Sequence, residues 1–123
     1  MKFNCGFVAS LALLSLGGCM NMPTPPVQIT GAYVSSLKYE VFDCSRLSTE
    51  LSTLSRRENQ LVSAQQQRIK TSETQAFWYG YGQGDGIEAS ELANVRGERE
   101  AIRSALDAKS CEYTKESHVK NKS

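Results

Sequence analysis

Apolar side chains recur at alternating steps of three and four residues in two long stretches of this 123-residue chain. The first stretch, 39–75, has no glycine or proline and is rich in residues that favour helices. The second covers 86–111. Such spacing predicts two helices that each bury one face against a partner. The stripe positions are Cys44, Leu47, Leu51, Leu54, Glu58, Leu61, Gln65 and Arg68, then Leu92, Val95, Arg99, Ile102, Leu106 and Lys109.

The two rows of predicted inward-facing positions, which we call stripes, are not apolar along their whole length. Beyond Leu61 the first stripe turns to glutamine and arginine, so we expect the run QQQRIKTSETQ (65–75) to be helical but wetter and less tightly packed. Five alanines in the second stretch would allow a close approach of the partner helix. Gly97 lies inside that predicted helix at a cost of ~1 kcal/mol relative to alanine. Packing around Gly97 is therefore expected to require a small residue.

A segment of unusual composition, 76–85, separates the two predicted helices. It contains four aromatic residues, and four glycines alternate with other residues from Gly80 to Gly86. We interpret 76–85 as the bend of a helical hairpin. At its end, Asp85 and Glu88 have the spacing of a capping box, in which Asp85 accepts a backbone N–H and Glu88 reaches back.

The first 18 residues have the layout of a secretory signal peptide: one lysine, a short apolar run, and small residues before Cys19. The apolar run is shorter than the ~20 residues of a spanning helix. Leu16-Gly17-Gly18-Cys19 resembles the lipobox of bacterial lipoproteins, which implies that Cys19 is acylated and becomes the first mature residue. An ordinary signal peptide with a chance cysteine is the alternative. Many such lipoproteins that stay at the inner membrane of Gram-negative bacteria have an aspartate after the cysteine. Met20 stands there instead, which favours the periplasmic side of the outer membrane.

Residues 19–37 are expected to form a flexible tether, because the prolines between Pro23 and Pro26 forbid a helix. The helical hairpin then occupies 38–112. A short polar tail, 113–123, completes the chain and reads as a frayed terminus.

Cysteine use suggests how so small a domain is stabilised. Cys5 leaves with the signal peptide and Cys19 is assigned to lipid, so Cys44 and Cys111 remain for one disulfide in an oxidising compartment. The midpoint between them falls within the aromatic segment, as expected for two antiparallel helices of similar length whose bases meet. The predicted fold is thus an all-α, disulfide-closed, two-helix hairpin. Two free thiols or a bridge between chains are the alternatives.

Charge and motifs indicate little chemistry. Without the signal peptide the chain has 13 basic and 13 acidic side chains, so no field steers it to nucleic acid. The one histidine, His118, lies in the tail, and no metal set or nucleophile–base pair can be assembled. Gly84-x-Gly86 lacks the strand that a dinucleotide site needs. We therefore expect no enzyme activity, cofactor or metal, and interpret the helix charges as a solvated surface.

The aromatic residues Phe77, Trp78, Tyr79 and Tyr81 carry the functional hypothesis. Clustered exposed aromatics are typical of binding surfaces, whereas buried ones would merely cap the thin end of the hairpin. The leading hypothesis is a non-enzymatic lipoprotein that holds this bend away from its anchor and presents it to an envelope protein or to peptidoglycan. Alternatives are a membrane-active lysis or exclusion lipoprotein, an accessory lipoprotein of a secretion or conjugation apparatus, and an oligomeric coiled coil.

The chain also resembles a group of small, poorly characterised proteobacterial lipoproteins. The resemblance covers 39–111 and implies a hairpin bracketed by the same two cysteines. The bend in that group commonly contains Phe-Trp-Pro, whereas Phe77-Trp78 is followed here by Tyr79 and glycines. The residues that carry the resemblance are Tyr39, Cys44, Leu47, Glu50, Leu54, Arg56, Gly84, Asp85, Glu91, Leu92, Ala93, Gly97, Glu98, Ala101, Lys109 and Cys111.

Overall fold

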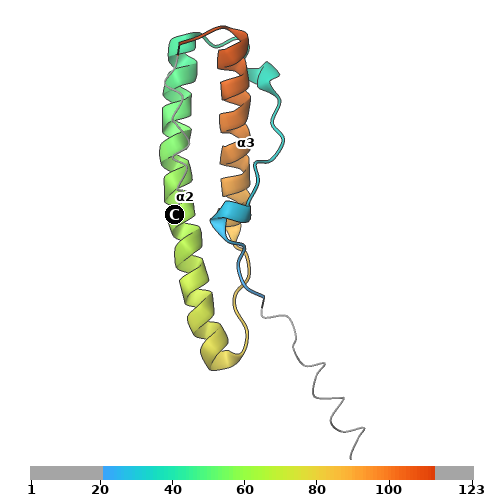
Figure 1. Cartoon of the computed structure of the whole chain (residues 1–123), viewed down its shortest axis with the longest axis vertical. Coiled ribbons are helices and arrows are strands. Elements are labelled where there is room, and N and C mark those ends of the chain that lie inside the picture. Colours follow the sequence, from blue (N-terminus) through green and yellow to red (C-terminus); the bar gives the residue numbers. More distant parts are fainter. Residues whose placement is uncertain (1–20, 113–123) are drawn as a thin grey trace, which may run out of the picture.

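The computed structural model describes residues 21–112, and this part of the chain is an all-α hairpin (Figure 1). Two short 3₁₀ helices, η2 (Pro26–Gln28) and η3 (Ser36–Tyr39), precede the long helices α2 (Cys44–Tyr79) and α3 (Ile87–Ala108). The predicted disulfide-closed hairpin is confirmed, with the Cα atoms of Cys44 and Cys111 5.6 Å apart. The predicted signal peptide, Cys19 and the tail with His118 lie outside the described residues.

Local capping explains where α2 begins and ends. It begins five residues later than predicted, because Asp43 is the N-cap and its carboxylate accepts the Arg46 N–H at 2.7 Å. It continues through Tyr79, four residues beyond the predicted end. Gly80 then ends it in the left-handed conformation, with φ of 83°. The three aromatics 77–79 therefore form the last turn of α2 and are not part of a loop.

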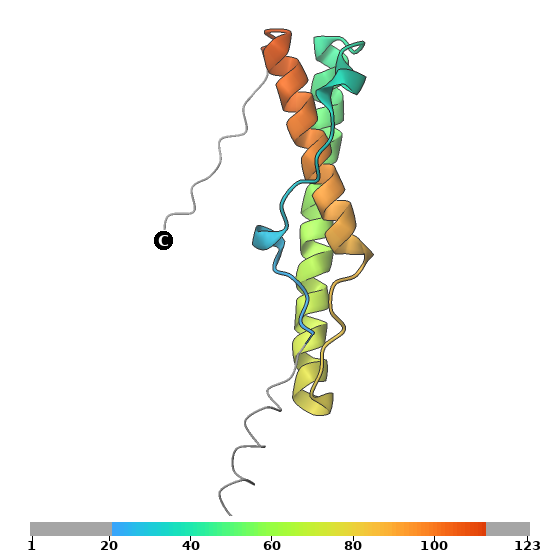
Figure 2. The same ribbon diagram turned by 90° about the vertical axis from the view of Figure 1, so that its right-hand side faces the viewer.

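The prediction of two helices of similar length is wrong, yet the cysteines still meet. At 1.5 Å per residue, α2 is ~54 Å long and α3 only ~33 Å. The missing length is supplied by the return segment, residues 81–86, which runs back along α2 without helical structure. Six extended residues cover ~20 Å, since an extended chain rises ~3.3 Å per residue. Figure 2 shows this segment beside the lower part of α2.

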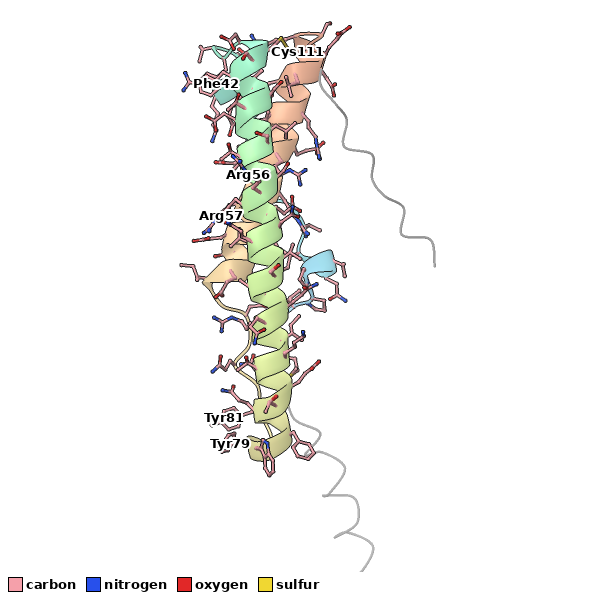
Figure 3. The ribbon with its side chains drawn as sticks, turned by 90° about the vertical axis from the view of Figure 1, so that its left-hand side faces the viewer. Phe42, Arg56, Arg57, Tyr79, Tyr81 and Cys111 are labelled. Atoms are coloured by element: carbon pink, nitrogen blue, oxygen red, sulfur yellow. A yellow bond between two sulfur atoms is a disulfide. The ribbon has the colours of Figure 1, made fainter. Side chains whose placement is uncertain are left out.

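The end of α3 brings Cys111 into reach of Cys44. Ser110 adopts a left-handed conformation with φ of 54°, and the N–H of Cys111 donates to the Leu106 carbonyl at 3.0 Å. This is the hydrogen-bond pattern with which helices commonly reverse the chain at their C-terminus. The reversal places Cys111 at the start of α2, at the end of the rod that we call the cysteine end (Figure 3).

Residues 21–43 lie along the hairpin, and we call this segment the strap (Figure 1). The expectation of a flexible tether is wrong for its described part, because the strap is fixed at several levels. The Ala32 N–H donates to the Ala93 carbonyl at 2.8 Å, and the Arg96 guanidinium donates to the carbonyls of Pro26 and Ile29. Near the cysteine end, Lys109 donates to the Glu40 carbonyl. The prolines exclude a helix, but they do not prevent docking.

Gly97 shows why the strap can lie so close to α3. A Cβ atom on Gly97 would overlap the carbonyl oxygen of Ala32, and one on Gly31 would meet the backbone of Gly97 at 3.0 Å. The prediction that packing at Gly97 demands a small residue is confirmed. The neighbour that requires it is the strap, however, and not α2.

The largest apolar core lies toward the cysteine end, where α2, α3 and the strap meet. Both stripes face inward there, as predicted. The fully or nearly buried members of this core are Tyr39, Leu47, Ala101, Ile102, Ala105 and Leu106. Farther along the rod Leu61 and Leu92 are also buried. Within residues 21–112, no helix combines the length and apolar character needed to cross a membrane.

The polar half of α2 is packed more tightly than predicted. Gln65 and Ser72 are both completely buried, although the sequence suggested a wetter surface here. The return segment and the beginning of the strap cover the part of this half that lies beyond the first turn of α3. Polar side chains suit such a cover, because irregular backbone needs hydrogen-bond partners that apolar groups cannot offer.

Candidate functional site at the aromatic tip

The four aromatics singled out from the sequence gather at one end of the rod, which we call the aromatic tip. Phe77, Trp78 and Tyr79 are consecutive in the last turn of α2, so their side chains spread around the helix axis. Their exposed fractions are 80%, 72% and 73%, and that of Tyr81 is 65%. Tyr79 and Tyr81 project from the lower end of the rod in Figure 3. The aromatics therefore do not cap the hairpin, and the alternative of a purely packing role is wrong.

The aromatic tip has few internal contacts. The rings of Phe77 and Trp78 meet edge to face, with centroids 5.2 Å apart. Ala76, which precedes them, is buried and accepts the Gly80 N–H that closes the helix. A backbone hydrogen bond and the small side chain of Ala76 are thus enough to close the helix end. The large rings are not needed for this and stay exposed.

The alternating glycines have a role that the sequence analysis missed. A Cβ atom on Gly82 would lie 3.1 Å from the Asn21 carbonyl oxygen and 3.1 Å from the Ser72 side chain, and one on Gly84 would press on the Asn21 amide group. Gly84 also has a φ of 70°, which favours glycine. These glycines leave room for the first described residues of the strap between the return segment and α2. The sequence signal for this close approach was the number of glycines, since a turn needs fewer than four.

A polar junction fixes the strap beside the return segment. The Asp85 carboxylate accepts the Thr24 N–H and the Thr24 hydroxyl, both at 2.6 Å, and the Gln65 amide at 2.8 Å. Gln65 also donates to the Thr24 carbonyl at 2.9 Å. Hydrogen bonds from Thr24 lower the pKa of Asp85 below its ordinary value. One carboxylate therefore joins three segments that are far apart in the sequence.

The predicted capping box is wrong. Gly86 is the N-cap of α3 and its first turn has no side-chain cap, since Asp85 is engaged at the junction. Glu88 forms an ion pair with Arg68 of α2 at 3.0 Å instead of reaching back. The carboxylate at the start of α3 still suits the positive end of the helix dipole. Spacing alone could not reveal that Thr24, 61 residues away, competes for Asp85.

Some of the helix charges, which we interpreted from the sequence as a solvated surface, form ion pairs between segments of the fold. Glu58 of α2 accepts hydrogen bonds from Arg96, at 2.8 Å, and from Arg99, and all three side chains are largely buried. Because Arg96 also donates to the strap, this cluster joins both helices and the strap at mid-height. Its charges act inside the fold.

The strap determines at which end of the rod the described chain begins. It begins against Gly82 and Gly84, close to the aromatic tip, and rises to the cysteine end (Figure 2). The first described residue of the strap and the aromatics are therefore at the same end of the rod. The expectation that the bend is held away from the lipid anchor concerns Cys19, which lies outside the described residues. Cys19 is only two residues before Asn21.

The junction makes a testable contribution to stability. Replacing Asp85 by alanine removes three hydrogen bonds and should lower the free energy of unfolding by about 1 kcal/mol at pH 7. The lowered pKa means that this contribution is present above about pH 4 and is lost as the pH falls further and Asp85 is protonated. Urea unfolding between pH 2.5 and 7 measures both effects.

The matched control for this experiment is Glu73→Ala, which removes an exposed carboxylate of α2 from the same half of the rod. It should leave the free energy of unfolding nearly unchanged at every pH. A cost of Asp85→Ala that is equal at pH 3 and pH 7 would contradict the ionised junction.

Comparison with known proteins gives no match to a family model, to a curated protein or to a solved structure. Among residues 21–112, no three His, Cys, Asp or Glu side chains are grouped as metal ligands would be.

Proposed function

We propose that this protein is a lipid-anchored, non-enzymatic component of the bacterial envelope, attached through Cys19 to the periplasmic side of the outer membrane. The observation that supports this best is the fixed entry of the chain into the rod. Thr24, five residues after Cys19, is held by Asp85 and Gln65. An anchor followed so soon by a docked strap would control the position of the whole rod, which a long flexible tether would not.

A role through contact, without catalysis, agrees with how the described charged groups are used. Glu58, Arg96, Asp85 and Arg68 connect segments of the fold to one another. The partner that we propose is another envelope protein or peptidoglycan, reached by the part of the rod that extends away from the anchor. The resemblance to small proteobacterial lipoproteins belongs to the same proposal.

Mass spectrometry of the protein purified from membranes tests the anchor. We expect the mature chain to begin at Cys19 and its N-terminal peptide to carry the mass of the acyl groups. Cys19→Ser should abolish this mass and the outer-membrane fractionation, whereas the control Cys5→Ser, within the signal peptide, should change neither. An unmodified mature N-terminus at any other residue would refute the proposal.

The membrane-active alternative is favoured by one observation, the exposure of the aromatic tip at the anchored end. It differs from the contact role in a measurable way. A membrane-active protein releases dye from lipid vesicles, whereas an anchored rod leaves them sealed.

A further inference from the structure

We propose that the aromatic tip docks in the headgroup region of the bilayer to which Cys19 is attached, so that the rod stands on the membrane with its cysteine end directed away. This inference rests on the proposed lipid anchor and adds a second, non-covalent contact with the same membrane. It commits to lipid as the occupant of the exposed aromatic surface. Three features support it: the position of the strap, the length of the rod and the chemistry of the tip.

The chain leaves the described structure close to the aromatic tip. Asn21 lies against Gly82, and the same position of Gly82 faces the side chain of Ser72, so Asn21 is level with Ser72 of α2. From Ser72 to Tyr79 the helix rises ~10 Å, and from Cys44 to Ser72 it rises ~42 Å. Two residues reach at most ~7 Å. An acylated Cys19 can therefore reach to within ~3 Å of the level of the tip, whereas the cysteine end is out of its reach.

These lengths match the dimensions of a membrane surface. The headgroup regions add ~10–15 Å in total to a hydrocarbon core of ~30 Å, so each is several ångströms thick. A rod whose end projects ~10 Å past the level of Asn21 would place its last helical turn in this layer. The hydrocarbon core is not reached, so the return segment keeps access to water and headgroups for its backbone groups.

The composition of the aromatic tip suits the headgroup region. Tryptophan and tyrosine are enriched there because their rings are apolar and their N–H or O–H groups can still form hydrogen bonds. All four rings are mostly exposed, so they can enter lipid without refolding. From Thr74 to Gly84 the sequence contains no charged residue, and docking would therefore transfer no side-chain charge into a less polar medium.

Trp78 is the one tryptophan of the chain, which makes it a direct probe of the tip. The acylated protein, purified from membranes, is reconstituted into phosphatidylethanolamine–phosphatidylglycerol vesicles whose acyl chains are brominated near the headgroup. We expect the emission of Trp78 to shift to shorter wavelength, to lose most of its intensity to the brominated lipid, and to become shielded from aqueous iodide.

A matched probe at the other end of the rod supplies the control. Val41 is 85% exposed and lies two residues before the N-cap of α2, at the cysteine end. The variant Val41→Trp/Trp78→Phe should keep emission typical of water, full access to iodide and no quenching by brominated lipid. Strong lipid quenching at both positions would mean that the rod lies flat, which contradicts the proposal.

A second variant tests whether the rings themselves hold the tip on the lipid. Phe77→Ser/Tyr79→Ser/Tyr81→Ser retains Trp78 and changes exposed side chains only, so the helical circular dichroism spectrum should be preserved. We expect this variant to lose most of the lipid quenching of Trp78. Quenching equal to that of the wild type would show that the anchor alone places Trp78 at the surface, and would overturn a docking role of the rings.

The remaining outcomes separate this inference from the proposed function. An acylated protein whose Trp78 stays open to iodide on vesicles contradicts docking and leaves the lipid anchor intact. Shielding of Trp78 in native membranes but not in vesicles of the purified protein indicates a protein contact, and also contradicts docking on lipid. Absence of acyl mass on Cys19 contradicts both proposals.

Discussion

Replacing Cys44 and Cys111 together by serine is expected to lower the free energy of unfolding by about 4 kcal/mol. The disulfide closes a loop that spans 67 positions of sequence, so its loss greatly increases the conformational freedom of the unfolded chain. Domains of this size commonly have only 5–15 kcal/mol of stability in total, so the effect is large. Urea unfolding followed by circular dichroism measures it.

Reduction of the wild-type protein with dithiothreitol provides the matched comparison, because it opens the same loop without changing the sequence. The two samples should unfold at nearly the same urea concentration, well below that of the oxidised protein. A difference of less than about 1 kcal/mol between the oxidised protein and the serine variant would show that the helix and strap contacts alone determine stability.

The second large effect is expected at Gly97. Helix propensity alone predicts that Gly97→Ala stabilises the protein by ~1 kcal/mol. We expect the opposite, a loss of about 2 kcal/mol, because the added methyl group would overlap the carbonyl of Ala32, which is backbone and cannot rotate aside. The strap must move outward, and the hydrogen bond from Ala32 to Ala93 is then lost. Urea unfolding gives the sign directly.

Asn94→Ala is the control, since Asn94 lies one turn earlier in α3 at an exposed position. There the helix propensity of alanine should appear as a small gain. Limited proteolysis adds a local measurement, because a displaced strap exposes the bond after Lys38 to trypsin. A Gly97→Ala protein that is more stable than the wild type and equally resistant to trypsin would disprove the close contact between strap and helix.

The sequence predicts the hairpin well because its pattern is local. Leu47, Leu61 and Leu106 follow the helical period, and the two cysteines left after the predicted signal peptide and lipidation site suffice to suggest the disulfide. The strap could not be predicted in this way. Its contacts pair Thr24 with Asp85 and Ala32 with Ala93, more than 60 residues apart, and no periodicity records such pairs.

The aromatic tip was found from composition, but its position was not. Phe77, Trp78 and Tyr79 were singled out as a candidate contact surface because they cluster beside glycines, but capping of the hairpin was an open alternative and their exposure could not be predicted. The end of the rod at which the described chain begins depends on the direction of residues 21–43. Gly97 was the sequence feature that indicated a close neighbour, although it could not identify the strap, and the close contact at Gly82 was not predicted.

The direction of the strap also determines how the protein bears mechanical load. A force applied at Asn21 along the rod, away from the cysteine end, acts parallel to the strap. The bonds at Thr24, Ala32 and Glu40 are then loaded together in shear, and none can be peeled off ahead of the next. A sideways force on Asn21 would instead open the junction at Asp85 first. The same contacts thus resist a force on Asn21 along the rod axis far better than a sideways force at the aromatic-tip end.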